Sequence, residues 1–241
     1  VTSDLEGNVS WTGTAATSVL PGLTGPRVAV TSDAGSAPTA SLTLAPNGTA
    51  VWSVTAEAEE AQLAAFVYAN VAKQFTKTHL NPGLAFLEQQ LSVTVNEAGN
   101  CNAYSTGNDI HFFPRDQQCE NTGLLADVVY HEFGHSLHAN SLVRGAGQFD
   151  SALSEGLADF LAASITGDHG MGRGFFFTNE ALRDIDPANR EARWPNDKST
   201  DPHATGEIIG GALWDMRKAL ITKLGNTAGV AQTLKLYYAV M

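Results

Sequence analysis

The chain has few basic residues and no long apolar stretch. Its 14 lysines and arginines are outnumbered by 25 aspartates and glutamates, which gives a net charge of −11. A protein with this charge lacks the cationic surface that nucleic acids and anionic membranes bind. No segment approaches the roughly 18 consecutive apolar residues that a membrane-spanning helix needs. The sequence therefore predicts neither a nucleic-acid partner nor a membrane span.

Cysteine is also scarce, since Cys101 and Cys119 are the two in the chain. They bracket a segment whose alternating pattern and Gly107-Asn108-Asp109 turn predict an edge-strand hairpin. A disulfide between them would contribute about 3 kcal/mol to stability in the chain-entropy model. Such a bond indicates an oxidising compartment, hence a secreted or extracytoplasmic protein. Two free buried thiols are the alternative.

Internal repeats and phosphate-binding glycine loops are missing as well. Hydrophobic residues make up 43% of the 241 positions, which is enough for a substantial core in one domain or two. We expect an α+β fold with three regions. These are a β-rich N-terminal region at 1–55, a core at 56–165 whose helices carry the candidate metal ligands described below, and a mainly helical C-terminal lobe at 166–241.

The first two regions carry local signals of secondary structure. Alternating apolar residues between turns predict short strands at residues 27–31, 40–44 and 50–54. Residues 56–78 then read as a helix, because large apolar side chains recur at helical spacing. The residues of that predicted face are Leu63, Phe66, Val67, Asn70, Val71 and Phe75.

The most informative motif is His131-Glu132-Phe133-Gly134-His135. Residues four apart lie on one face of a helix, so both imidazoles can reach one tetrahedral ion at roughly 2.0–2.1 Å. Glu132 lies beside them and can act as a general base toward the attacking water. The surrounding apolar residues predict that this helix is buried.

A second predicted helix follows, and it carries two carboxylates four residues apart. Glu155 supplies the third metal ligand, and Asp159 accepts the spare N–H of a ligand histidine, His131 in our interpretation. Three protein ligands leave one position of a tetrahedral zinc ion open, which is typical of a catalytic site.

At these residues the chain resembles the gluzincin zinc metallopeptidases, the group that includes thermolysin and fungalysin. Nineteen residues separate His135 from Glu155, as in thermolysin. The metzincin pattern does not fit, because it requires a glycine and a histidine where this chain has His138 and Ser141. The resemblance implies a thermolysin-like peptidase core, one zinc ion per chain, a peptide or protein substrate, and binding of the enzyme's own pro-segment.

The resemblance extends to a third segment, which begins at His203. Its His-x-x-Gly-Glu pattern is similar to the element of fungalysin-like enzymes whose histidine stabilises the oxyanion of the reaction. The resemblance therefore implies that His203 is catalytic. Asp201 or Glu207 would orient its imidazole, and the sequence does not choose between them.

Two further segments resemble substrate-binding elements of the family. Asn102 and Ala103 match an Asn-Ala-aromatic edge strand that pairs with an extended peptide. An ordinary hairpin is the alternative interpretation. Arg183 matches an arginine that binds the carbonyl just beyond the scissile bond, and a surface salt bridge is the alternative there.

The chain departs from the family's pattern at one position. Binding of structural calcium is a separate question that the sequence raises. The tyrosine that assists the oxyanion in thermolysin falls near Ala146, which has no hydroxyl. Some thermolysin-like enzymes bind structural calcium, and this chain has many aspartates but no twelve-residue EF-type loop. The aspartates concerned are Asp150, Asp168, Asp184, Asp186, Asp197 and Asp201.

These patterns together predict a secreted, zinc-dependent endopeptidase. A zinc hydrolase of a non-peptide amide would use the same ligands without needing Asn102 and Ala103. A binding or adhesion protein with a silent zinc site is the other alternative. The presence of Glu132 argues against a silent site, because the base is what an inactive relative would lose.

Overall fold

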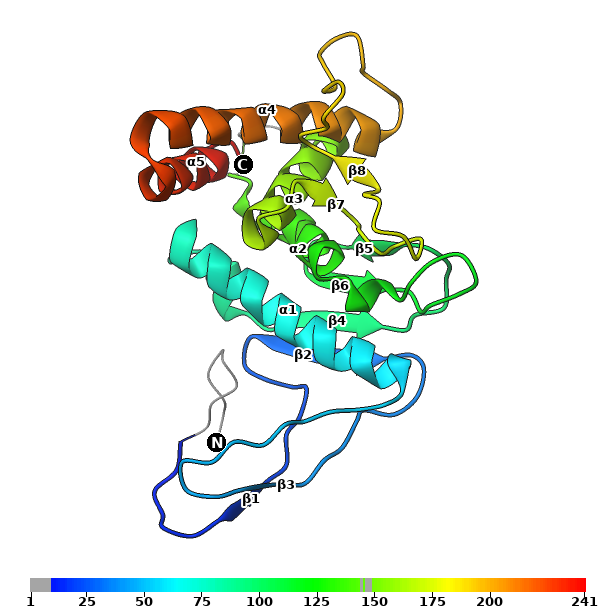
Figure 1. The fold of residues 1–241 in the computed structure, drawn as a ribbon, viewed down its shortest axis with the longest axis vertical. Coiled ribbons are helices and arrows are strands. Elements are labelled where there is room, and N and C mark those ends of the chain that lie inside the picture. The colour runs from blue at the N-terminus through cyan, green and yellow to red at the C-terminus, as the bar shows by residue number, and fades with distance from the viewer. Residues whose placement is uncertain (1–9, 144, 146–148) are drawn as a thin grey trace.

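The computed structural model describes residues 10–143, 145 and 149–241, and its main elements are labelled in Figure 1. Strands and helices both contribute to the core, so the predicted α+β class is confirmed. Among the described helices, none has the length and apolar character needed to cross a bilayer.

A four-stranded sheet with the order β2-β4-β6-β5 is the main β element. Strands β2 (Val28–Ser32), β4 (Leu91–Val95) and β6 (Asp109–Phe112) are parallel. Strand β5 (Ala103–Ser105) pairs antiparallel with β6 and forms one edge. The predicted hairpin between the cysteines is thus present as β5 and β6.

Two small antiparallel pairs lie outside this sheet. Strand β1 (Thr17–Val19) pairs with β3 (Leu42–Leu44), and β7 (Gly170–Met171) pairs with β8 (Arg183–Asp184). The predicted strand at residues 50–54 is wrong, because this segment has no strand partner and Val51 is 82% exposed. Strand β4, which sequence analysis did not predict, lies between β2 and β6.

One face of the sheet is buried, and the other carries polar side chains. Alternate residues of each strand point to the same side, because the side-chain period of a strand is two. The buried set is Val28, Val30, Leu91, Val93, Val95, Ile110 and Phe112. Helices α1 (Glu57–His79) and α2 (Ala126–Ser141) pack on the sheet and on each other (Figure 1).

Helix α1 agrees with the predicted helix in its length but not in its buried face. Its fully buried apolar residues are alanines, Ala61, Ala65, Ala69 and Ala72. Small side chains let the helix approach the sheet closely, so the predicted large residues lie at the flanks of the contact, and Val67 is exposed. Periodicity alone located the helix and misassigned its inner face.

Three further helices complete the fold: α3 (Ser151–Thr166), α4 (Pro202–Leu224) and α5 (Asn226–Ala239). Aspartates cap two of them, since the Asp150 side chain accepts from Leu153 N and the Asp201 side chain accepts from His203 N. Two short 3-10 helices, η1 (Ala85–Glu88) and η2 (Thr122–Leu124), join strands and helices.

Helices α2, α3 and α4 cross at glycines, which allow their backbones to touch. A Cβ on Gly134 of α2 would lie 2.8 Å from Ala158 Cα of α3. A Cβ on Gly156 of α3 would lie 2.5 Å from the carbonyl oxygen of Gly206 in α4. Side chains next to these crossing points are therefore held close together.

Strand β2 shows how the N-terminal region is connected to the rest of the chain. It belongs to the predicted first region, yet it pairs in register with β4 along its whole length. The segment that contains β1 and β3 lies at one end of the molecule, and α4 and α5 lie at the other (Figure 1). The division into three regions stays a prediction.

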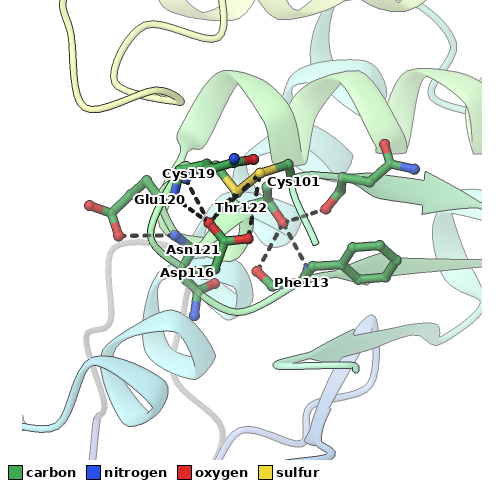
Figure 2. Close-up of a disulfide and its surroundings, with 9 residues drawn as sticks. Cys101, Phe113, Asp116, Cys119, Glu120, Asn121 and Thr122 are labelled. Carbon is green, nitrogen blue, oxygen red and sulfur yellow. Dashed lines mark hydrogen bonds between the residues drawn. A yellow bond between two sulfur atoms is a disulfide. The ribbon is translucent and has the colours of Figure 1, made fainter. Parts of the chain in front are cut away.

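A disulfide joins Cys101 to Cys119, with the Cα atoms 5.5 Å apart (Figure 2). The Asp116 carboxylate lies beside both sulfur atoms and accepts hydrogen bonds from the backbone N–H groups of Gln118 and Cys119. Thr122 completes the connection, because its hydroxyl donates to the Asn102 carbonyl at 3.0 Å. This hydrogen bond fixes the backbone of Asn102, the residue just before β5. The predicted pairing of Cys101 with Cys119 is confirmed.

We expect the double substitution Cys101→Ala/Cys119→Ala to lower the free energy of unfolding by about 3 kcal/mol, because the unfolded chain gains the entropy of an open loop. Urea denaturation measures the change, and wild type in excess reductant should match the variant. An unchanged denaturation midpoint in the variant would contradict this expectation.

We expect Gly156→Ala to destabilise the protein by about 1–3 kcal/mol, because the new methyl group must push α3 and α4 apart. Gly22→Ala is the matched control, since no atom lies within 4 Å of a Cβ at that position. Denaturation of both variants tests the crossing, and equal midpoints would show that α3 and α4 tolerate the extra volume.

Candidate active site

Helices α2 and α3 bring three metal-ligating side chains together in a buried position. His131 and His135 have their Nε2 atoms 3.0 Å apart. Glu155 Oε2 lies 3.1 Å from His131 Nε2 and 3.6 Å from His135 Nε2. Ligands 2.0–2.1 Å from a tetrahedral ion are about 3.3 Å from one another. The spacing of the three atoms therefore matches a zinc ion between them.

The second nitrogen of each imidazole already has a partner. His131 Nδ1 lies 2.7 Å from Asp159 Oδ1, and His135 Nδ1 lies 2.8 Å from Ser154 Oγ. In the tautomer that binds a metal ion, each Nδ1 carries the proton, and both Nε2 atoms then present a lone pair to the space that Glu155 Oε2 also faces. That oxygen is buried and has no hydrogen-bond donor among the described residues. Three convergent electron pairs are the donor set that a metal cation requires.

Burial and neighbouring charges set the protonation of the two histidines. Burial lowers the pKa of His131, but the Asp159 carboxylate outweighs this effect and raises it to about 10. Burial, reinforced by the charge of His131, lowers the pKa of His135 to about 3. A metal ion at this site must therefore displace one proton, which lies on His131.

Glu132 is buried next to these ligands and faces the cleft. Burial raises the pKa of Glu132 to about 7, and the charge of Glu155 acts in the same direction. A carboxylate with a pKa near neutrality can both accept and return a proton under physiological conditions.

A buried ion pair between Arg183 and Asp159 lies next to His131, on the side away from the other two ligands. Arg183 donates two hydrogen bonds to the Asp159 carboxylate, from Nε at 2.8 Å and from Nη2 at 2.7 Å. Although burial opposes the charged form, Arg183 and His131 hold the pKa of Asp159 well below its usual range. Arg183 lines the cleft and is largely buried, so this pair is not the surface salt bridge that sequence analysis kept as an alternative.

His203 lies at the start of α4, on the other side of Glu155. Its Nε2 is 3.4 Å from Glu155 Oε1, and its Nδ1 is 3.0 Å from Asp201 Oδ1. Of the two acidic residues considered from the sequence, Asp201 contacts this imidazole. Glu207 instead lies 3.4 Å from the backbone N–H of Asp184, and burial raises its pKa.

A cleft of about 990 Å³ passes over the three ligands. Strand β5 forms one wall, together with the residues just before and after it. Side chains from α2 hold this wall in place: Ser105 and Ser136 share a hydrogen bond of 2.8 Å, and Asn140 Nδ2 donates to the Gly107 carbonyl at 2.8 Å. Asn102 is exposed and precedes β5, and Ala103 begins it.

The remaining walls are partly apolar and partly acidic. The apolar part includes Val128, Met171, Phe175 and Leu182. The acidic part, near α4, includes Asp201 and Glu207.

The aspartates that raised the question of calcium have protein partners and do not form one cluster. Asp168 pairs with Arg173, Asp184 with His169, and Asp197 with Arg190. Asp186 belongs to an acidic group with Glu191 and Asp215, and all three contact the ammonium group of Lys218. The described residues therefore give calcium no support.

The resemblance to the gluzincins places a second oxyanion residue near position 146. Ala146, the position expected from the resemblance, lies outside the described residues.

Comparison with known proteins identifies a similar fold but assigns the chain to no family. No protein-family model matches the chain, and no curated protein is similar to it in sequence. Among solved structures, the chain is similar to the precursor of protealysin, a metalloproteinase from Serratia proteamaculans, with a TM-score of 0.53 and 15% sequence identity. The match covers 88% of this chain and 86% of the other. At this identity the likeness shows a shared fold alone.

Two residues at the site escaped sequence analysis. Ser154 contacts His135 and directly precedes Glu155, so its position beside a ligand was a usable signal. Ser136 contacts β5 and directly follows His135, but nothing in the sequence indicates which strand lies against that face of α2.

We expect Asp159→Asn to weaken zinc binding by about 10–100-fold, because the neutral amide no longer favours the electron-donating form of His131. Competition with a chromophoric chelator measures the dissociation constant. Asp197→Asn is the matched control, since it also removes a carboxylate paired with an arginine, but outside the cleft. Equal zinc affinity in the two variants would rule out this supporting role of Asp159.

Proposed function

We propose that the protein is a zinc-dependent endopeptidase. The convergence of His131 Nε2, His135 Nε2 and Glu155 Oε2 carries this proposal, because the three atoms face one point at the spacing that a tetrahedral ion requires. The sequence motif, its 19-residue spacing to Glu155 and the fold shared with a metalloproteinase precursor support assignment to the gluzincins with a thermolysin-like layout.

His131, His135 and Glu155 would hold the zinc ion, and Asp159 would keep His131 in the required tautomer. When bound, zinc supplies Lewis-acid polarisation of the scissile carbonyl and makes the attacking water more acidic. The buried carboxylate of Glu132 takes the proton of this water and returns it to the leaving amine. Its pKa of about 7 suits both transfers.

His203 would stabilise the negative charge that develops on the carbonyl oxygen. Its Nε2 points toward the ligand cluster, and Asp201 holds Nδ1 and thereby fixes the direction of the ring. A donor placed at a developing oxyanion is worth a few kcal/mol of transition-state stabilisation.

The substrate would be an extended peptide lying along β5. This strand is at the edge of its sheet and its outer side faces the cleft, so its main chain can pair with a peptide without reading side chains. Asn102 and Ala103 would contribute to this pairing, and Arg183 would bind the carbonyl beyond the scissile bond. Main-chain recognition along a strand favours internal cleavage over removal of terminal residues.

The disulfide supports action in an oxidising compartment, so we propose that the protein is secreted. The similar solved structure is described as a precursor. By analogy, a pro-segment of the protein's own chain would be a second occupant of the cleft.

We expect Glu132→Gln to lower kcat/KM for casein cleavage by at least about a hundredfold while one zinc ion per chain is retained, because only the proton acceptor is lost. Elemental analysis and casein cleavage measure the two quantities. Glu180→Gln, outside the cleft, is the control for loss of one carboxylate and should cleave like wild type. Chelation should abolish wild-type activity, and added zinc should restore it.

Other results would change the assignment. Absence of bound zinc would overturn the proposal. Zinc without cleavage of any peptide, but with turnover of small amides, would indicate a non-peptide amidase, and its activity would survive substitution of Asn102. Full casein cleavage by Glu132→Gln would reject the general-base role.

A further inference from the structure

Glu207 lies in the cleft one helical turn beyond His203. Residues four apart on a helix occupy the same face, so both side chains of α4 are directed at the same region. Both line the cleft, together with Arg183 from β8. Glu207 is therefore close to the position where a bound peptide would meet the catalytic groups.

The other carboxylates at the ligand cluster already have a role in the geometry. Glu155 faces the two ligand histidines, Asp159 binds His131 and Arg183, and Asp201 binds His203. Glu207 has none of these roles. Its hydrogen bond is to the backbone N–H of Asp184, at the long distance of 3.4 Å.

Glu207 has no ion-pair partner among the described residues, and the charge of Arg183 acts on it from beyond contact distance. In the ranges 10–143, 145 and 149–241, no lysine, arginine or histidine nitrogen lies within 4.0 Å of its carboxylate. Arg183 is the nearby candidate, but both of its hydrogen bonds to side chains go to Asp159. The cleft wall near α4 thus carries a carboxylate that has one polar contact and no cation in direct contact among the described residues.

We propose that Glu207 determines specificity by binding the cationic side chain of a lysine or arginine beside the scissile bond of the substrate. The inference rests on the proposed peptidase function and adds a substrate class to it. A half-buried carboxylate on a cleft wall is less screened than one on an open surface, so it discriminates between cationic and neutral side chains. The net charge of −11 also attracts basic peptides toward the protein.

A peptide scan with purified wild type at low ionic strength tests the inference. One lysine is moved through the positions on either side of a single cleavable bond in an otherwise neutral peptide, and each peptide has a norleucine counterpart of nearly equal shape. We expect one position at which lysine raises kcat/KM about tenfold over norleucine, with the difference residing mainly in KM.

The variants isolate the charge of Glu207. Glu207→Gln keeps an oxygen for the Asp184 N–H and removes the charge, so the lysine-to-norleucine ratio should fall to about one. Glu207→Lys should reverse the preference toward a glutamate at the same position, which provides a second test if the first variant folds poorly. Glu191→Gln, outside the cleft, removes an equal charge and should keep the wild-type ratio.

The outcomes separate the two proposals. Cleavage of the peptides with no lysine preference, or with a preference that persists in Glu207→Gln, would overturn the assignment of Glu207 and leave the peptidase function intact. Failure of wild type to cleave any peptide in the set or casein would overturn the peptidase function, and the specificity inference with it.

Discussion

Backbone contact between α2, α3 and α4 is the constraint on which the candidate site depends. Gly134, Gly156 and Gly206 leave no room for a side chain at the crossings. Gly156 follows Glu155 and Gly206 precedes Glu207, so the crossing of α3 and α4 lies next to two residues of the candidate site. The short distances between Nε2 and carboxylate atoms therefore result from the packing of whole helices, which is far stiffer than the rotamer of any one side chain.

Sequence reasoning worked well wherever the relevant partners are close along the chain. His131 and His135 share a helix face because of helix geometry alone, and so do Glu155 and Asp159. The hairpin of β5 and β6 and the length of α1 are also local features. For these elements, the chemical type and the spacing of the residues are sufficient, since no other part of the chain has to be placed first.

Features that depend on long-range packing could not be predicted in the same way. Strand β4 lies between β2 and β6, but its five residues are no more apolar than other short segments. Helix α1 buries its alanines against the sheet, and the sequence of the helix alone does not show which of its faces meets the sheet. Likewise, Arg183 meets Asp159 from a different element, and Ser136 meets Ser105 across a helix-strand contact.

The proposed pairing of a peptide with the open edge of β5 implies a limit on the substrates that would be cleaved. A strand edge can pair only with a chain that is itself extended and has free backbone groups, so a folded target must first open locally. Each 1.4 kcal/mol of local stability in the target lowers its open fraction about tenfold. Turnover would then follow the local unfolding equilibrium of the target when that opening is fast. The rate at which the protein cleaves a target would therefore depend on how readily that target unfolds locally.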